Sequence, residues 1–395
     1  MSSKEHYYAD RFDLKILNNI LLILKKIGIN PPSFDSIQKS IPKNLNLNSN
    51  EINHVLKEYK HFLETGNFTA LGEFVHKAII LNSIKKGEKL NLINNNGSDN
   101  INKPHIFVTG LPRSGTTYLH NFLINNLEYQ GLKFWEIISP NSLNIPYILS
   151  KSIKKIEAFI AWLLFLYFVP LVQKMHKVKI SSYEECWHFL RNYFWCYNYF
   201  IQTGFKPFGD LMLNLDISMF YKRYRTYLQT KMINNPKPFI LKNPEHMLYL
   251  DNIKDVFPSS ISICIHRDPL KTIPSYCGMI SQVRYLYFGK INRTEIGEFV
   301  MNLYQNMINK MNQTKNNKNV IHIPFNQLIN EPLEILTYLN NNFNLKIIKG
   351  QEKKDIKKNS KLYKNKLRFT LEDFNLNKDD IKNKFSSYYK MYKIN

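Results

Sequence analysis

The sequence predicts an α/β fold in which a parallel β-sheet is flanked by helices. The first observation is a series of four short apolar segments, each followed by a stretch whose apolar residues recur at helical spacing. Strands that alternate with helices favour parallel pairing, with helices covering both faces of the sheet. The second observation is an aromatic-rich stretch at about 130–235, which predicts a helical insertion between the first two strands. The four segments are HIFVTG (105–110), PFILK (238–242), SISICIH (260–266) and NVIHIP (319–324).

Each strand is expected to lead into a helix. After the first strand, TTYLHNFLINNL (116–127) places its leucines and Phe122 on one helix face. The second helix is expected to run through Leu248 and Phe257. Asp268 and Pro269 form a good N-cap and first-turn pair for the third helix, and the fourth is expected at 331–343.

The residues before the first strand are expected to form a separate helical region. ILNNILLILKKIGI (16–29) has apolar residues at helical spacing, and Gly28 with Pro31 and Pro32 predicts its end. NLINNNGSDNINKP, which ends at Pro104, is polar and low in complexity, and this predicts a loop. We therefore expect a helical N-terminal region with an Asn-rich linker at 1–103 and the main domain at 104–395.

Composition places weak limits on function. The 395 residues carry a formal net charge of +23 with a pI near 9.6, which favours anionic partners. Much of the excess is Lys among Asn, so we discount it and expect no nucleic-acid partner. The four cysteines form no CxxC pair and no zinc-ligand spacing, which predicts buried free thiols and no metal site. The N-terminus has no apolar core of a signal peptide. We expect a cytoplasmic location, with membrane association as the alternative.

One apolar segment leaves the relation to membranes open. AFIAWLLFLYFVPLV (158–172) has no charge, but it is shorter than the about 20 residues of a spanning helix and contains Pro170. One interpretation is a buried helix or the wall of an apolar pocket. The alternative is peripheral membrane contact through 156–173, with nearby Lys151, Lys154 and Lys155 facing anionic lipid.

The most informative segment is the loop between the first strand and its helix. It reads Gly110-Leu-Pro-Arg-Ser-Gly-Thr-Thr117. A turn from a strand into a helix N-terminus directs several backbone N–H groups at one point, where an anion can bind. Gly110 and Gly115 permit close backbone approach, while Ser114, Thr116 and Thr117 add hydroxyl donors.

This loop is of the P-loop type but differs from that of ATPases and kinases. Against the pattern GxxxxGK[ST] it keeps both glycines and has Thr116 in place of the lysine. Its cation, Arg113, comes earlier and could stabilise the leaving group of a phosphosulfate without a metal. A nucleotide or small-molecule kinase on the same scaffold is therefore the alternative enzyme.

FVTGLPRSGTTYLHNFL resembles the 5′-phosphosulfate loop of sulfotransferases in the variant with PRSGTT. The order of further segments, among them WEIISP, SYEECWHFL, ILKNPEHMLYLDNIKDVFP and CIHRDPLKTIPSY, is similar to the roughly 380-residue sulfotransferases common in bacteria. The resemblance runs from about residue 105 to the C-terminus. It implies transfer of a sulfuryl group from 3′-phosphoadenosine 5′-phosphosulfate (PAPS) to a hydroxyl or amine.

The resemblance also implies roles for individual residues. Arg267 and Ser275 would hold the 3′-phosphate of PAPS, which suits a bidentate guanidinium and a hydroxyl in the first turns of a helix. Lys242 would contact the sulfuryl oxygens and stabilise charge in the transition state. Arg368 would contribute to the 3′-phosphate pocket, although Leu367 and Phe369 replace the His and Tyr that the family often shows around it.

Two residues compete for the role of general base. Glu136, in WEIISP, is favoured because similar PRSGTT-type sulfotransferases use a Glu in this region. His246 is the rival because cytosolic sulfotransferases use a His shortly after a comparable Lys, and its ordinary pKa suits proton transfer near neutral pH. Glu184 and Glu185 are expected to be structural, with a role in acceptor binding left open.

The aromatic residues of the insertion suggest a small acceptor that is aromatic or lipid-like. Besides the kinase, the remaining alternative is a non-catalytic, membrane-associated nucleotide-binding protein.

Overall fold

The computed structural model describes residues 11–41, 50–90, 104–140, 146–314, 317–348 and 369–394. The Asn-rich linker expected before Pro104 falls largely outside them. The described part contains a four-stranded sheet in the order β2-β1-β3-β4, with every neighbouring pair parallel. The predicted α/β class and all four strands are thereby confirmed. The strands are β1 (Ile106–Gly110), β2 (Ile240–Lys242), β3 (Ile261–His266) and β4 (Val320–Pro324).

Alternation along the strands divides the core between the two faces of the sheet. In β1, Ile106 and Val108 pack with Leu119 of the following helix, whereas Phe107 belongs to the larger cluster on the other face. Successive side chains of a strand point to opposite faces, so both faces need a cover of helices. The helices that follow the strands are α6 (Thr116–Asn126), α14 (Leu250–Val256), α15 (Pro269–Phe288), α16 (Arg293–Gln313), α17 (Phe325–Asn330) and α18 (Pro332–Phe343).

The helix expected through Leu248 begins differently from the prediction. Pro244–Leu248 forms a 3-10 turn, η2, and the α-helix starts only at Leu250. The turn directs Glu245 toward a cavity and His246 into the core.

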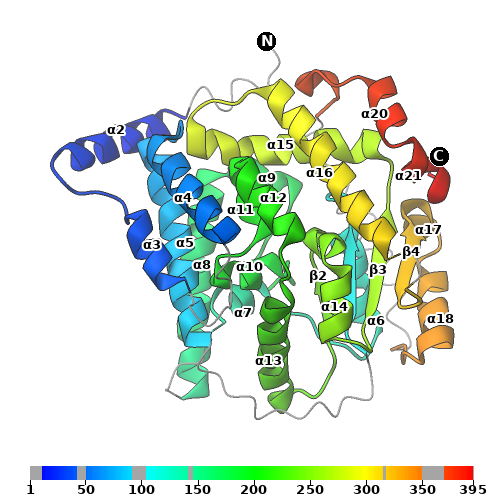
Figure 1. The fold of residues 1–395 in the computed structure, drawn as a ribbon. Coiled ribbons are helices and arrows are strands. Elements are labelled where there is room, and N and C mark those ends of the chain that lie inside the picture. Colours follow the sequence, from blue (N-terminus) through cyan, green and yellow to red (C-terminus); the bar gives the residue numbers. More distant parts are fainter. Residues whose placement is uncertain are drawn as a thin grey trace.

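The N-terminal region is helical, as predicted, and shares a core with the rest of the chain. Figure 1 shows its helices (blue to cyan) on the side of the molecule away from β4 and α18. Gly72 lies so close to α15 that a Cβ atom there would stand 2.1 Å from the carbonyl oxygen of Tyr287. The amide of Thr69 donates to the same carbonyl at 2.8 Å. The four helices are α2 (Phe12–Lys26), α3 (Phe34–Ser40), α4 (Asn50–Thr65) and α5 (Ala70–Leu90).

The insertion between β1 and β2 is helical and aromatic, as predicted. Trp195, Tyr193 and Tyr221 are among the largest fully buried side chains. Its elements are α7 (Phe134–Ile138), α8 (Tyr147–Phe168), α9 (Pro170–Met175), α10 (Trp187–Leu190), η1 (Arg191–Tyr193), α11 (Tyr197–Thr203), α12 (Lys206–Asn214) and α13 (Ser218–Asn234). After the sheet, the chain ends in η3 (Glu372–Phe374), α20 (Lys378–Lys384) and α21 (Ser386–Met391).

The apolar segment at 158–172 forms the second half of α8 and the start of α9. Pro170 is the first residue of α9, and Val169 between the helices breaks the helical backbone. Among the described residues, we find no helix whose length and apolarity would let it cross a bilayer.

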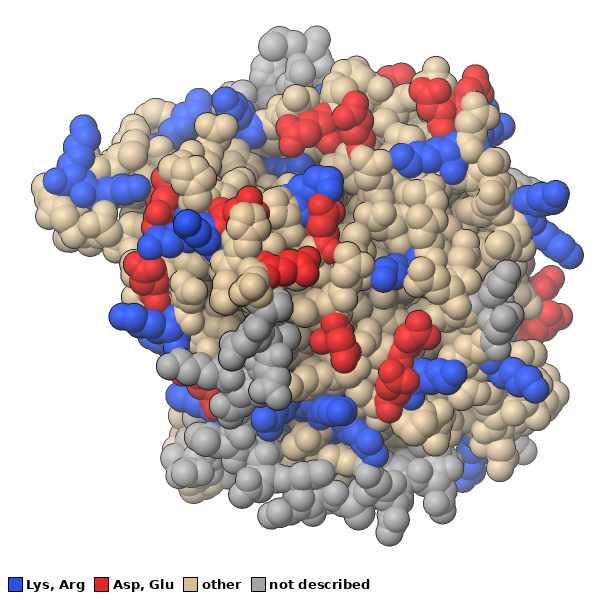
Figure 2. Space-filling model, in the orientation of Figure 1, with Lys and Arg blue, Asp and Glu red and all other residues tan. Residues whose placement is uncertain are grey.

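The four cysteines are buried and free, as expected. On the face drawn in Figure 2, basic and acidic side chains alternate, so the charge excess forms no single basic patch there.

Candidate active site

The loop between β1 and α6 has the backbone of an anion cradle. Gly110 and Gly115 have φ angles of +145° and +106°, a region that side chains with a Cβ rarely enter. Gly115 is the N-cap of α6, so the first amides of the helix, at Thr116 and Thr117, have no acceptor within it. The Ser114 hydroxyl is buried and has no hydrogen-bond partner among the described residues. A bound anion would satisfy these donors.

The structure brings Arg113, Arg267 and Ser275 together at this loop. The Nε of Arg113 donates to the Ser275 Oγ at 3.1 Å, and Nη1 of Arg267 donates to the Arg113 carbonyl at 2.9 Å. The Arg267 guanidinium lies over the Phe325 ring, 3.9 Å from its centroid, and its buried Nε has no partner among the described residues. Arg113 itself has a φ of +70°, a strained backbone conformation for a residue with a side chain, and its side chain is directed at Ser275.

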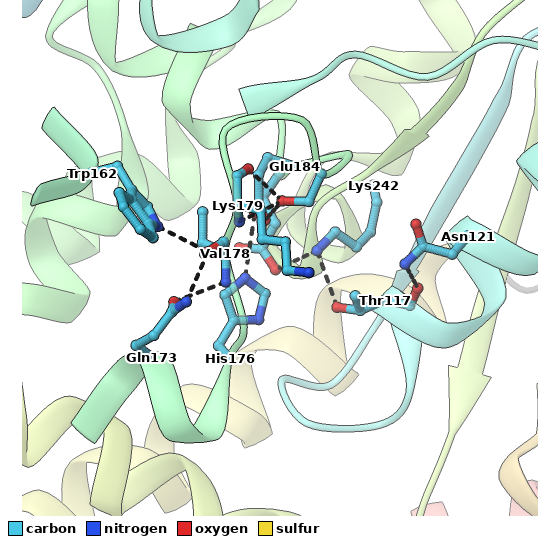
Figure 3. A network of polar contacts seen from close by, with 11 residues as sticks. Thr117, Asn121, Trp162, Gln173, His176, Val178, Lys179, Glu184 and Lys242 are labelled. Atoms are coloured by element: carbon cyan, nitrogen blue, oxygen red, sulfur yellow. Dashed lines mark hydrogen bonds and ion pairs between the residues drawn. The ribbon is translucent and has the colours of Figure 1, made fainter. Parts of the chain in front are cut away.

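Lys242 lies beside the loop at the end of β2. The register of the sheet pairs it with Val108 of β1, two residues before Gly110. Its side chain is fully buried (0% exposed), and its Nζ donates to the Thr117 Oγ1 at 3.1 Å and to the Glu185 Oε1 at 3.0 Å. Figure 3 shows Lys242 directed at Thr117. The Nζ of Lys242 is therefore held next to the N-terminus of α6 through its bond to the Thr117 side chain.

Glu185 is the carboxylate that the structure adds to this group. Burial by itself would raise its pKa, but the Lys242 ammonium, with smaller contributions from His176 and Arg113, holds the pKa below its usual value. The carboxylate is therefore ionised at neutral pH. Glu185 stands in the segment SYEECWHFL, but its proximity to Lys242 could not be inferred from the sequence, because the two residues are 57 positions apart.

The segment that carries Glu185 is tied to its surroundings. Trp162 of α8 and Gln173 of α9 both donate to the carbonyl of Val178, at 2.9 and 2.8 Å. Glu184 accepts from His176 at 3.3 Å, and Figure 3 shows these contacts around one turn of chain. These bonds fix the position of the next residue, Glu185.

Neither predicted general base lies on the cavity at the loop. Glu136 accepts from the Lys133 amide at 3.0 Å and pairs with Lys231 at 3.2 Å, so both of its oxygens are engaged within the insertion. His246 is fully buried against Phe107 and bonds to the Tyr221 hydroxyl at 2.7 Å. Burial lowers the pKa of His246 to about 3, which keeps its ring neutral. Neither is among the residues that line the cavity. Lys242 is not among them either, but its Nζ bonds to two residues that are, Thr117 and Glu185.

Glu245, to which no sequence motif assigned a role, lines the cavity. Burial raises its pKa to about 8, although a hydrogen bond from Asn198 at 3.0 Å opposes the shift. The carboxyl group of Glu245 is therefore protonated at neutral pH and can donate a hydrogen bond.

The cavity has a volume of about 2050 Å³. Single-ligand pockets usually measure about 300–1,000 Å³, so this cavity has room for a nucleotide and a second molecule. At one end it is lined by Arg113, Thr117, Glu185 and Arg267. Toward α2, α5 and α8 the lining is mostly apolar, and its polar members there are Asn82, Ser83, Lys86 and Glu157.

The C-terminal part of the predicted site is only partly visible. Arg368 lies outside the described residues. Phe369 packs on α15 where Gly278 leaves no side chain, since a Cβ there would stand 2.2 Å from the Phe369 ring. Phe369, Thr370 and Leu371 line the cavity. The aromatic residue in place of the family's usual Tyr thus lies at the site.

At the carboxyl edge of an α/β sheet, a loop with the backbone of an anion cradle and two arginines lies beside a large, mostly apolar cavity. The sequence model of the sulfotransferase family matches residues 104–347, more than half of the chain, and the chain belongs to that family. The chain is therefore a sulfotransferase.

Solved structures agree with this fold. The sulfotransferase STF1 of Mycobacterium tuberculosis H37Rv is similar with a TM-score of 0.69 and 19% identity, over 91% of this chain and 99% of that one. STF9 of Mycobacterium avium gives a TM-score of 0.72 and 16% identity, over 91% and 96%. No curated protein matches the chain.

Proposed function

We propose that the protein transfers a sulfuryl group from PAPS to a hydroxyl or amine of a small, apolar acceptor. The observation that carries the proposal is the contact between Arg113, Ser275 and Arg267 at the β1–α6 loop, at one end of a mostly apolar cavity. PAPS has a 5′-phosphosulfate and a 3′-phosphate, and the two groups of donors match these two anions.

The donor end holds the nucleotide through fixed positive charge. The amides of Thr116 and Thr117, the Ser114 hydroxyl and the N-terminus of α6 bind the 5′-phosphate. Arg267 and Ser275 bind the 3′-phosphate, which ATP lacks. Arg113 lies between the two groups and stabilises the bridging oxygen as negative charge develops on it.

The transfer step needs a base and a cation near the acceptor. Lys242 stabilises the equatorial oxygens of the sulfuryl group once its bonds to Thr117 and Glu185 yield to the donor. Glu185 accepts the proton of the acceptor while the acceptor oxygen bonds to sulfur. The bond from sulfur to the bridging oxygen breaks, and adenosine 3′,5′-bisphosphate leaves. Glu185 is ionised, lines the cavity and lies 3.0 Å from Lys242, which favours it over Glu136 and His246.

The test is a thermal-shift comparison of the purified protein with adenosine 3′,5′-bisphosphate, with 5′-AMP and with ATP plus magnesium. A ligand at about 100 times its dissociation constant adds roughly 2.7 kcal/mol to the free energy of unfolding, enough for a shift of a few degrees. Stabilisation by the bisphosphate above that by 5′-AMP supports the proposal. Stabilisation by ATP with magnesium alone would favour the kinase, and a folded protein that responds to none of the three would contradict nucleotide binding.

A further inference from the structure

Two helices beside the cavity expose apolar side chains in rows. On α8, Leu149, Ile153, Ile156, Ile160 and Leu163 follow each other at spacings of three or four and are all exposed. This spacing places them on one face of the helix. Nine large apolar side chains of α8 are exposed among the described residues. A surface helix normally presents polar residues to water, so this face is unusual.

The exposed face continues onto α2. Phe12, Ile16, Ile20, Ile23 and Ile27 also recur at spacings of three or four and are exposed. The start of α2 is joined to the end of α8, where the Arg11 guanidinium donates to the Tyr167 carbonyl at 2.9 Å. We call the exposed apolar side chains of α2, its following turn and α8, together with Phe74 of α5, the apolar face. It holds 17 of the 22 large apolar side chains exposed among the described residues.

The cavity opens on this face. Four residues of the apolar face are both well exposed and part of the cavity lining, and they come from all three helices: Ile20 (46% exposed), Phe74 (42%), Ile160 (54%) and Leu164 (50%). Outside this face, the exposed side chain of Ile329 on α17 also lines the cavity. A molecule lying against the apolar face could therefore enter the cavity without crossing water. The lining of the same cavity includes Val75 and other apolar side chains, and also Glu185 and Thr117.

The positive charge beside the apolar face favours an anionic bilayer as its binding partner. The two helices contain six lysines and two carboxylates; of the lysines, Lys154 is buried and Lys25 pairs with Glu73, so four remain as lipid contacts. Asp13 is paired with Arg11, and Glu157 is paired with Lys86. Lysines beside an apolar face reach lipid phosphates while their stems remain among apolar groups. A second copy of the chain, docked through the same face in a symmetric dimer, would bring these lysines against one another.

We propose that the apolar face docks on an anionic bilayer and that the cavity takes its acceptor from that bilayer, as an amphiphile with an apolar tail and a terminal hydroxyl or amine. The choice of acceptor rests on the proposed function. The tail occupies the part of the cavity between α2, α5 and α8, and the head group reaches Glu185.

The test uses vesicles of phosphatidylcholine with and without phosphatidylglycerol, sedimented with the full chain. The face variant Ile153→Glu with Ile156→Glu changes two exposed side chains that do not line the cavity. The matched control, Ile233→Glu with Leu333→Glu, makes the same changes at exposed positions on α13 and α18. We expect the wild type and the control to sediment with the anionic vesicles. Two lost isoleucine contacts should weaken binding by the face variant about 100-fold or more.

Wild-type protein that stays in solution, or a face variant that binds as well as the control, would overturn the docking proposal. A dimer in light scattering that dissociates only in the face variant would do the same and would assign the face to a second copy. Sulfation of 4-dodecylphenol in vesicles should exceed that of 4-methylphenol, and equal rates would overturn the acceptor assignment. Stabilisation of both variants by adenosine 3′,5′-bisphosphate is the separate readout for the proposed function, because neither substitution touches the donor end.

Discussion

Arg267 offers the most direct test of the nucleotide site. In the structure its Nη1 supports the Arg113 carbonyl at 2.9 Å and its guanidinium lies on Phe325, while its buried Nε has no partner among the described residues. The Nε–H is therefore available for the 3′-phosphate. The substitution Arg267→Met keeps much of the side-chain volume and removes the charge and all donors.

The magnitude follows from the number of donors available. A hydrogen bond to a charged group contributes about 1.5–3 kcal/mol, and each 1.4 kcal/mol corresponds to about a tenfold change in affinity. We expect Arg267→Met to weaken binding of adenosine 3′,5′-bisphosphate by about 10- to 100-fold. Binding of 5′-AMP, which lacks the 3′-phosphate, should change far less. Loss of the bond to the Arg113 carbonyl should also lower the free energy of unfolding by about 1 kcal/mol.

Isothermal titration with the two nucleotides measures the difference directly. Lys254→Met is the matched control, because it removes an exposed positive charge from the last turn of α14. This turn leads into the amino end of β3, whereas Arg267 follows the carboxyl end of β3. An equal loss of affinity for both nucleotides would mean that Arg267 acts only by holding the loop. Unchanged affinity for the bisphosphate would refute the assignment of the 3′-phosphate to Arg267.

Three further predictions concern other parts of the chain. Glu185→Gln should lower kcat by about 100-fold or more with bisphosphate affinity retained, whereas a comparable loss only in Glu136→Gln would identify that residue as the base. The pKa of Glu245 is about 8 in the folded protein and near the ordinary value of 4.5 in the unfolded chain, so the protein loses stability as pH rises through this window. The Tm of Glu245→Gln should therefore fall less than the Tm of the wild type between pH 5 and 8. An equal fall of Tm in both proteins would contradict the shift. Gly72→Ala should destabilise the protein by roughly 1–3 kcal/mol in urea titrations despite the better helix propensity of Ala, because its Cβ would meet Tyr287, and a gain in stability would show that the two helices can separate cheaply.

Local sequence determined the strands and the anion-binding loop. Each strand is a short apolar run beside a helical pattern, and these signals span only a few neighbouring residues. The loop was also readable, because Gly110 and Gly115 stand where the backbone needs positive φ and Arg113 lies between them. The outcome is four strands within a residue or two of their expected bounds.

The proposed general base, Glu185, could not be read in the same way. Glu136 was favoured because of its position in a segment, but its carboxylate caps its own helix and pairs with Lys231. Glu185 approaches Lys242 only because the insertion folds back over the end of β2. Contacts of this kind depend on the path of the whole chain, which residue spacing does not encode.

The apolar segment of α8 also combines a feature that the local sequence predicts with one that only the tertiary structure decides. Its composition predicted a helix with a pocket wall or membrane contact as alternatives, and it could not tell which side would be covered. The tertiary structure makes one side of α8 a wall of the cavity and leaves the other exposed beside α2. The sequence by itself therefore determined which elements form, because backbone conformation follows local spacing. Only the tertiary structure decided which side chains meet and which remain exposed, because burial depends on packing between segments far apart in the chain.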